Sequence, residues 1–186
     1  MESSRNRVCP VGLANWLDIS VRRWLHNPQV ILAPYVKEGM TVLDIGCGPG
    51  FFSIEMAKMV GESGKVVAAD LQDGMLQKLR KKIQGTGLER RIELVKCDKD
   101  RINITKGVDF IFAFFMVHEV PDKNSLFRQL RDILREKGQL LLVEPKILHV
   151  SRKEFELTTR LAEDAGFKTF NGPRIRFGRS AVLRKV

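Results

Sequence analysis

The chain contains 186 residues, of which 44% are hydrophobic and 29% charged, a composition typical of a single soluble globular domain. Its longest apolar stretches, such as 110–117, are far shorter than the ~20 residues of a membrane helix, and its N-terminus lacks the apolar core of a secretory signal. These features argue against a membrane span and predict a cytoplasmic protein. The net charge is +10, and residues 168–186 contain no acidic side chain, so the chain can attract anionic partners, unless the charge serves solubility alone.

Three cysteines, Cys9, Cys47 and Cys97, are spread along the chain. They are too few for a disulfide framework and do not form a CxxC pair, so we expect a reducing compartment and no metal site. Cys9 precedes Pro10 and is expected to be a packed or solvated thiol, with a reactive thiol as the alternative.

The segment before the first predicted strand is expected to be helical, and we divide the chain into an N-terminal helical extension at 1–38 and a main domain at 39–186. Pro28 follows Asn27 and suits the first turn of a helix, so two short amphipathic helices are expected here. Trp16 and Trp24 either pack on the core or belong to a lid over the site.

Strand-like and helix-like segments then alternate along the chain. Short apolar runs, each suited to a strand buried on both faces, occupy 41–45, 65–69, 92–96, 109–114 and 139–144. Apolar residues at helical spacing occupy 52–60, 74–83, 124–135 and 153–165. A glycine that can end a helix in a left-handed cap stands near each helix end, at Gly61, Gly85, Gly138 and Gly166. The connection 98–108 shows little helical period and is expected to be a loop or short helix.

This alternation predicts an α/β fold with a doubly wound, mostly parallel sheet and helices on both of its faces, because parallel strands need crossover connections. Two further short strands, 167–171 and 180–185, are predicted near the C-terminus, with Gly172, Pro173 and Gly178 between them. They suit an antiparallel hairpin with a connection longer than a tight turn.

A glycine-rich turn, Gly46-Cys47-Gly48-Pro49-Gly50, follows the first strand and precedes a helix. Glycines there permit a tight turn and close approach of a ligand, at the strand end where doubly wound sheets bind nucleotides. Asp70 ends the second strand about 20 residues after Gly50 and can accept hydrogen bonds from both hydroxyls of a ribose. The turn therefore predicts a ligand that contains a ribose.

Two classes of cofactor compete for this turn. A nicotinamide dinucleotide uses the spacing G-x-G-x-x-G and a helix N-terminus that faces a pyrophosphate, whereas the spacing here is Gly46-x-Gly48-x-Gly50. Asp44 adds negative charge beside the turn, which suits a cationic amino group better than a pyrophosphate. A dehydrogenase would also need a further substrate domain, for which 186 residues leave no room.

The stretch from Val42 to Gly50 resembles the first motif of the class I S-adenosylmethionine-dependent methyltransferases, V-L-D-x-G-C-G-x-G. The likeness extends to the C-terminus and includes Asp70-Leu71, Cys97-Asp98, 118–122 and 140–144. The sequence His-Glu-Val-Pro-Asp at 118–122 is similar to the small-molecule branch that includes the quinone-biosynthesis methyltransferases. The resemblance implies a three-layer fold with seven strands in the order 3-2-1-4-5-7-6 and the last strand antiparallel.

The resemblance also implies that these motifs bind S-adenosylmethionine. Gly46 to Gly48 would lie along the methionine part, Asp70 would hold the ribose, and Asp98 would receive the adenine amino group. Leu71 and Met75 would flank the adenine, unless they only pack in the core. Asp44 would approach the methionine ammonium and Phe114 would offer its backbone carbonyl. The full set of expected cofactor-binding residues is Asp44, Gly46, Cys47, Gly48, Gly50, Asp70, Leu71, Met75, Cys97, Asp98, Lys99 and Phe114.

Methyl transfer from a sulfonium is a direct displacement, so the protein mainly aligns the reacting groups and excludes water. His118 would face the substrate after the fourth strand and is the candidate catalytic base, with Glu119 as a candidate partner. A structural or exposed histidine is the alternative. Phe51, Phe114 and Phe115 either line a methyl-transfer channel or pack in the core.

We therefore expect an enzyme, an S-adenosylmethionine-dependent methyltransferase that acts on a small-molecule acceptor. The alternatives are an RNA or protein methyltransferase that uses the basic C-terminal surface, and a cofactor-binding subunit without activity of its own. The chain lacks, after the fourth strand, the motif [Asp/Asn/Ser]-Pro-Pro-[Tyr/Phe] with which similar enzymes methylate exocyclic amines of bases or glutamine side chains. Nucleic acid is therefore the less favoured partner, and the sequence does not set the oligomeric state.

Overall fold

The computed structural model describes residues 25–146 and 150–186, so Cys9, Trp16 and Trp24 lie outside the described residues. The strands are β1 (Thr41–Ile45), β2 (Lys65–Asp70), β3 (Ile92–Lys96), β4 (Val108–Phe114), β5 (Leu134–Pro145), β6 (Phe167–Asn171) and β7 (Gly178–Lys185). The helices are α2 (Pro28–Leu32), α3 (Phe51–Met59), α4 (Asp73–Ile83), α5 (Lys123–Ile133) and α6 (Arg152–Asp164), with a 3-10 turn, η2, at Val117–Glu119. The predicted alternation of strands and helices is confirmed for the main domain.

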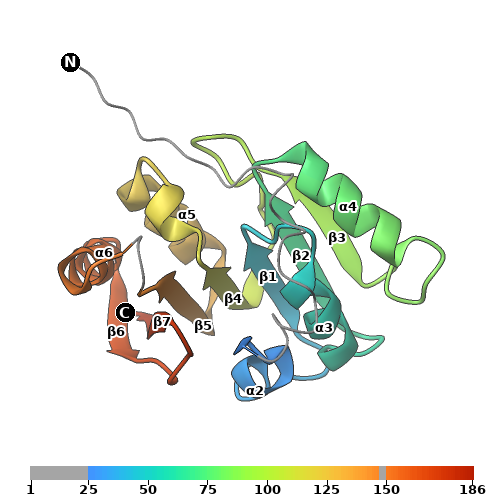
Figure 1. Cartoon of the computed structure of the whole chain (residues 1–186), viewed down its shortest axis with the longest axis horizontal. Helices are drawn as coiled ribbons and strands as arrows, with labels where there is room; N and C mark the ends of the chain where they lie inside the picture. Colours follow the sequence, from blue (N-terminus) through green and yellow to red (C-terminus); the bar gives the residue numbers. More distant parts are fainter. Residues whose placement is uncertain (1–24, 147–149) are drawn as a thin grey trace.

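Seven strands form one sheet in the described part of the chain, in the order β3-β2-β1-β4-β5-β7-β6. β1 pairs in parallel with β2 and β4, β2 with β3, and β4 with β5, whereas β7 is antiparallel to both β5 and β6. Figure 1 shows α4 beside β2 and β3 at one end of the sheet, and α5 and α6 near β5, β6 and β7 at the other. The predicted strand order and the predicted hairpin are confirmed.

Helices cover both faces of the sheet because successive strand residues point to opposite faces and both sets are apolar. On β1, Val42 lies in the core that α2, α3 and α4 cover, whereas Leu43 lies in the core under α5 and α6. Phe112 and Ile111 of β4 divide between the two cores in the same way, and all four side chains are fully buried. With both faces filled, the ends of the strands are left for a polar site.

Helix α2 packs into the core of the main domain. Asn27 caps its first turn by accepting a hydrogen bond from the backbone N–H two residues on, at 3.0 Å, and Pro28 occupies the first turn as predicted. Leu32 is buried in the same core as Val42. The division of the chain at residue 38 stays a prediction.

One helix ends earlier than its sequence pattern predicts. The helix predicted to reach Arg135 ends at Ile133, and Leu134 begins β5 by pairing with Val108. Leu134 is fully buried there, so the gain from burying it in the sheet outweighs one more turn of helix. The prediction that Gly138 ends this helix in a left-handed conformation is therefore wrong.

The strand predicted to begin at residue 139 begins five residues earlier, at Leu134, and the other predicted boundaries agree with the structure to within two residues. The connection after β3 is a loop. The left-handed glycines predicted at the remaining helix ends are confirmed at Gly61, Gly85 and Gly166. Across residues 25–146 and 150–186, no helix combines the length and the apolar character that crossing a bilayer requires.

Candidate functional site

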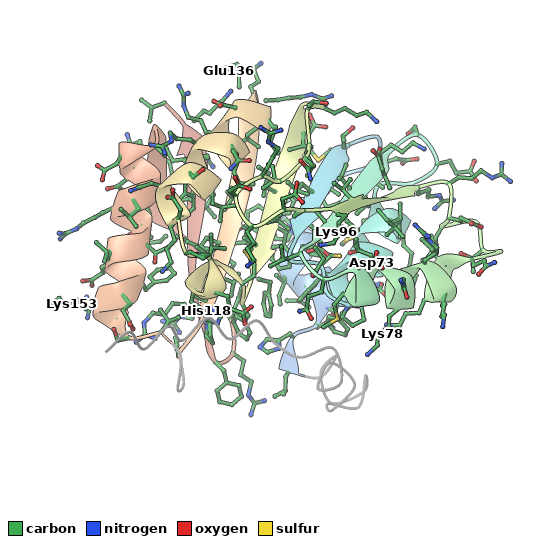
Figure 2. All side chains as sticks on the ribbon, turned by 90° about the horizontal axis from the view of Figure 1, so that it is seen from above. Asp73, Lys78, Lys96, His118, Glu136 and Lys153 are labelled. Carbon is green, nitrogen blue, oxygen red and sulfur yellow. The ribbon has the colours of Figure 1, made fainter. Side chains whose placement is uncertain are left out.

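The carboxyl ends of β1, β2 and β4 meet at one edge of the sheet, because these strands are parallel neighbours. β1 lies between β2, which follows it in the chain, and β4, so the direction in which strands are added to the sheet changes at this point. Ligands of doubly wound sheets bind in the crevice at such a switch point. The turn Gly46–Gly50 lies at this point, between β1 and α3. Figure 2 shows His118, which follows β4, at the edge of the molecule opposite Glu136.

The glycines of this turn all have positive φ, but their surroundings differ. A Cβ atom on Gly46 would lie 2.8 Å from Met116, and one on Gly50 would lie 2.2 Å from Leu79, so both positions are closed by packing. A Cβ atom on Gly48 would meet nothing within 4 Å. Gly48 therefore presents its backbone to open space, where a ligand can approach.

Asp70 ends β2 beside this open space. Its Oδ2 accepts a hydrogen bond from the Gly48 N–H at 2.8 Å, and its Oδ1 accepts one from the Gln72 N–H, also at 2.8 Å. The side chain is nearly buried, at 8% exposed. Each carboxylate oxygen can accept a second bond, so the carboxylate is oriented to receive a pair of hydroxyl groups.

Asp44 lies beneath the turn and is almost completely buried. The Ser53 hydroxyl of α3 donates a hydrogen bond to its Oδ2 at 2.5 Å, which ties the strand to the helix that follows it. Burial, together with the negative charges of Asp44 and Asp70, raises the pKa of the Cys47 thiol far above its ordinary value. Cys47 is therefore a neutral thiol packed in the core, and its backbone N–H and carbonyl are hydrogen bonded to Ala69 and Gly50.

The end of β3 lies next to Asp70. The Cys97 N–H donates to the Asp70 carbonyl at 3.0 Å, and burial raises the pKa of the Cys97 thiol to about 12. Asp98 is exposed and accepts a hydrogen bond at Oδ2 from the side chain of Asn103, whose backbone is left-handed. Lys99 is exposed on the same loop.

Leu71 and Met75, the residues expected beside an adenine, follow Asp70 in the chain. Leu71 is half-buried, and Met75, on the first turn of α4, is 4% exposed. The structure thus brings the predicted residues of β2 and β3 to one place and leaves their roles in binding a prediction.

An aromatic cluster borders the site at the end of β4. Phe114 and Phe115 stack with ring centroids 4.1 Å apart, and His26 meets both rings edge-on at 5.1 and 5.6 Å. His26 also hydrogen bonds through Nε2 to the Arg176 carbonyl at 2.9 Å. The start of the described chain and the loop between β6 and β7 therefore both reach this edge.

His118 lies on η2, just beyond β4, and contacts a carboxylate from β5. Its Nδ1 is 2.9 Å from Oε2 of Glu144, whereas its Nε2 is 3.9 Å from Oε1 of Glu119. Burial acts to lower the pKa of His118, but the hydrogen bond and charge of Glu144 and the charge of Glu119 outweigh it, so the net pKa is raised. Glu144 is therefore the nearer partner of His118.

In the described part of the chain, hollows lie at the carboxyl ends and at the amino ends of the strands. One, of about 320 Å³, is lined by His118, residues 120–124 and Leu161 of α6. The other, of about 420 Å³, is lined by residues at the amino ends of β1, β2 and β3, among them Thr41, Lys65 and Ile92. The smaller cavity is the one near the site, because the larger lies at the edge away from the glycine turn.

Residues 36–170 match the family of the methyltransferase domain, which covers more than half of the chain. The chain belongs to this family. It is a class I S-adenosylmethionine-dependent methyltransferase, and the curated relatives place it near the ubiquinone and menaquinone biosynthesis C-methyltransferases.

Those relatives are the UbiE proteins of Enterobacter sp. (strain 638) and Cronobacter sakazakii, which are 33% and 34% identical to this methyltransferase over 110 residues. The match covers 59% of this chain and 44% of either relative. The chain thus matches less than half the length of these curated relatives.

Solved structures share this fold over most of the chain. An S-adenosylmethionine-dependent methyltransferase from Aquifex aeolicus is 28% identical, with a TM-score of 0.82 over 95% of this chain and 98% of its own. Fibrillarin from Aeropyrum pernix, solved with natively bound S-adenosylmethionine, is 18% identical over 81% of this chain and 68% of its own, with a TM-score of 0.62. The latter likeness concerns the fold alone.

S-adenosylmethionine is the cofactor of this methyltransferase family, and the residues present fit it. The ligand carries a ribose with two hydroxyls, which suits the oriented carboxylate of Asp70, and the open space at Gly48 leaves room for its methionine part. Among the described residues, no cluster of His, Cys, Asp and Glu side chains is arranged to hold a metal ion.

Sequence reasoning missed four residues that shape this methyltransferase site: Ser53, Asn103, His26 and Glu144. Ser53 and Asn103 make side-chain bonds to predicted aspartates, but serine and asparagine near a turn are too common to single out. His26 and Glu144 hydrogen bond to residues that are 150 and 26 positions away in the sequence, Arg176 and His118 respectively. One sequence feature could have pointed to Glu144: it is a carboxylate at the end of a strand that is buried on both faces.

Proposed function

We propose that this chain transfers the methyl group of S-adenosylmethionine to a small-molecule acceptor by direct displacement. The observation that carries the proposal is the Asp70 carboxylate, held by two backbone N–H groups beside the open face of Gly48. The small-molecule acceptor is supported by the likeness to the quinone-biosynthesis C-methyltransferases, which covers 59% of the chain.

The residues of the site divide the work between them. When bound, the cofactor supplies a methyl group on a positively charged sulfonium. Asp70 and the backbone of the glycine turn orient the ribose and methionine parts, while Asp98 is the candidate for the adenine amino group. Phe114 and Phe115 border the reaction space with apolar rings, which exclude water and favour a cation.

His118 and Glu119 remain the candidate catalytic residues. Both follow β4, at the edge where the acceptor is expected, and the side chain of His118 lines the 320 Å³ cavity. An acceptor that must lose a proton would use them, and an acceptor that is already nucleophilic would not.

Calorimetric titration tests the cofactor assignment. Asp70→Asn should weaken binding of S-adenosylmethionine about 30- to 1,000-fold, a loss of roughly 2–4 kcal/mol, because hydrogen bonds to a charged acceptor contribute roughly 1.5–3 kcal/mol each and the amide keeps one acceptor oxygen. Asp73→Asn is the matched control, since Asp73 is an exposed carboxylate three residues further on, on the first turn of α4. Binding of a nicotinamide dinucleotide in place of S-adenosylmethionine would overturn the proposal.

A screen of small acceptors with labelled cofactor tests the activity. Turnover of a small molecule supports the proposal, whereas tight cofactor binding without turnover on any acceptor favours a subunit that binds the cofactor for a partner.

A further inference from the structure

Glu144 is a buried carboxylate that is not among the predicted catalytic residues, His118 and Glu119. It follows Val143, the last residue of β5 that pairs with β4, is 1% exposed, and contacts the chain that leaves β4. Its Oε1 accepts a hydrogen bond from the Val117 N–H at 3.1 Å, and its Oε2 accepts one from the His118 N–H at 2.9 Å. Both oxygens therefore act as acceptors, and the carboxylate fixes η2 against the sheet.

The contact between Glu144 and the imidazole of His118 determines which ring nitrogen carries the proton when the ring is neutral. Nδ1 lies 2.9 Å from Oε2, an oxygen that already accepts a backbone N–H, so Nδ1 is the donor in this contact. In the neutral ring the proton then sits on Nδ1 and the lone pair on Nε2. A carboxylate that orients a histidine in this way leaves Nε2 as the atom that takes up a proton.

We propose that Glu144 and His118 form a proton-accepting pair, and that the methyl acceptor carries an acidic O–H or an activated C–H that Nε2 of His118 deprotonates. This inference rests on the proposed methyl transfer and adds the chemical class of the acceptor. His118 is the catalytic residue, and Glu144 is the positioning residue that acts through it.

The surroundings of the pair suit such an acceptor. Glu144 of β5 and Glu119 of η2 place negative charge near the imidazole, whereas Lys123 at the start of α5 opposes them. The cavity beside His118 is lined by Asp122 and Lys123 on the α5 side, and by the apolar Val120 and Leu161. Charged and apolar side chains therefore both line the space beside the imidazole.

The step balances without a further reagent. The acceptor loses its proton to Nε2 of His118, and the electron pair left behind forms the new bond to the methyl carbon. The electron pair of the broken carbon–sulfur bond stays on sulfur, which becomes a neutral thioether. His118 then carries one positive charge, which Glu144 balances until the proton is released to water.

Nitrogen NMR of the His118 ring tests the pair without any turnover. In the ligand-free protein, the neutral ring should carry its proton on Nδ1, and the ring should titrate above the ordinary histidine pKa. Glu144→Gln should lower that pKa and mix the two tautomers, while Glu119→Gln should change them less, because Glu119 lies further from the ring. A neutral ring protonated at Nε2, or a titration that Glu144→Gln does not move, would overturn the inference.

Turnover gives the second test, with phenols and 1,3-dicarbonyl compounds as acceptors and aliphatic amines as the comparison. His118→Gln should lower kcat about 100-fold or more at unchanged KM for S-adenosylmethionine, the usual size of a general-base effect. Glu144→Gln should lower kcat and move the rise of the rate with pH to lower pH. Glu136→Gln, an exposed carboxylate at the opposite edge of the sheet, is the control that should leave turnover unchanged.

The outcomes separate the two proposals. Wild-type turnover that survives His118→Gln, or that favours the amines, rejects the acid–base pair and keeps methyl transfer. Absent turnover on every acceptor in the wild type contradicts the proposed function, while the tautomer measurement still decides the pair. If Glu144→Gln does not fold, His118→Gln and the wild-type NMR spectrum suffice.

Discussion

At the scale of single residues, the glycine turn separates positions that serve the ligand from positions that serve packing. Gly50 is closed by Leu79 and Gly46 by Met116, whereas Gly48 opens on space and donates its N–H to Asp70. Positive φ alone does not distinguish them, because all three share it.

Gly48→Ala should therefore weaken cofactor binding, whereas Gly85→Ala should not. Gly85 has a similar left-handed backbone and equally open surroundings but ends α4, away from the site. Both variants should lose about 1–2 kcal/mol of unfolding free energy, the cost of a left-handed alanine. Only Gly48→Ala should bind S-adenosylmethionine about tenfold or more weaker by calorimetry, because its methyl group enters the ligand's space. Equal affinities would show that the ligand does not approach Gly48.

The raised pKa of His118 predicts a pH-dependent part of the stability. The folded protein holds this proton more tightly than the unfolded chain, whose value is near 6.5. Protonated His118 therefore stabilises the fold fully below pH 6.5, and this contribution is lost as the pH rises through the higher folded value. Urea unfolding of the wild type and His118→Gln should show a stability difference that shrinks over this range. A difference that is constant with pH would contradict the raised pKa.

A site residue could be predicted from the sequence where a single motif contains both the functional side chain and the backbone that it contacts. Asp70 follows the glycine turn at a fixed spacing, and the structure places it against Gly48. Glu144 was not predictable as a partner of His118, because their contact depends on β4 and β5 being neighbours with Phe114 opposite Val143. Such pairings follow from strand register, which a sequence pattern does not specify.

At the scale of elements, the described chain begins at the edge of the site. His26 is 8% exposed, packs against Phe114 and Phe115, and bonds to the loop before β7. His26, two residues before α2, is thus fixed at the end of β4. The lid over the acceptor, expected from Trp16 and Trp24, lies outside the described residues and stays a prediction.

Removing residues 1–24 should reduce turnover more than stability. The contacts of His26 and α2 with the core remain in this variant, so thermal unfolding should change little. Turnover should fall and the KM of the acceptor should rise if the segment acts as a lid. Unchanged turnover and affinity would reject the lid.

The strands were easier to predict than the end of one helix. β1 and β3 kept their predicted bounds, although β3, at the edge of the sheet, is only partly buried and not buried on both faces as predicted. The helical spacing continued past Ile133, but Leu134 pairs with Val108 and is buried in the sheet. Local periodicity cannot report a pairing with a strand that lies more than twenty residues away, so this boundary needed the structure.

At the scale of the whole molecule, positive charge gathers on the C-terminal hairpin. Lys168 and Arg184 both lie over the exposed ring of Phe170, at 5.7 and 4.9 Å from its centroid. Arg176 lies over the exposed ring of Phe177 in the same way. Cations and rings together are the features that single-stranded nucleic acid would need, so the alternative acceptor must be tested directly.

Salt dependence distinguishes the acceptors. Turnover of a neutral small molecule should change little between about 50 mM and about 200 mM salt. RNA that contacts several phosphates would lose on the order of 10³-fold or more in affinity over this range. Filter binding and turnover measured in the same salt series provide the comparison, and RNA binding that withstands salt would weaken this distinction.

The strand order of the whole sheet was predictable only through the family resemblance. Alternating strands and helices predict a parallel sheet, but they do not say that β7 inserts between β5 and β6. Once the first motif, Asp70 and the C-terminal hairpin were taken together, the family's order followed, and the structure confirms it.

The boundary between β1 and β4 at the centre of the sheet separates two groups of contacts that can be mutated independently. On one side, the β1–β2 half holds the Gly48–Asp70 bond, and on the other, the β4–β5 half holds the His118–Glu144 bond. Neither bond shares a residue with the other. If the acceptor binds as proposed, we expect substitutions around η2 and the start of α5 to alter acceptor choice while the donor side stays intact. This half is then the natural target for exchanging segments between relatives in the laboratory.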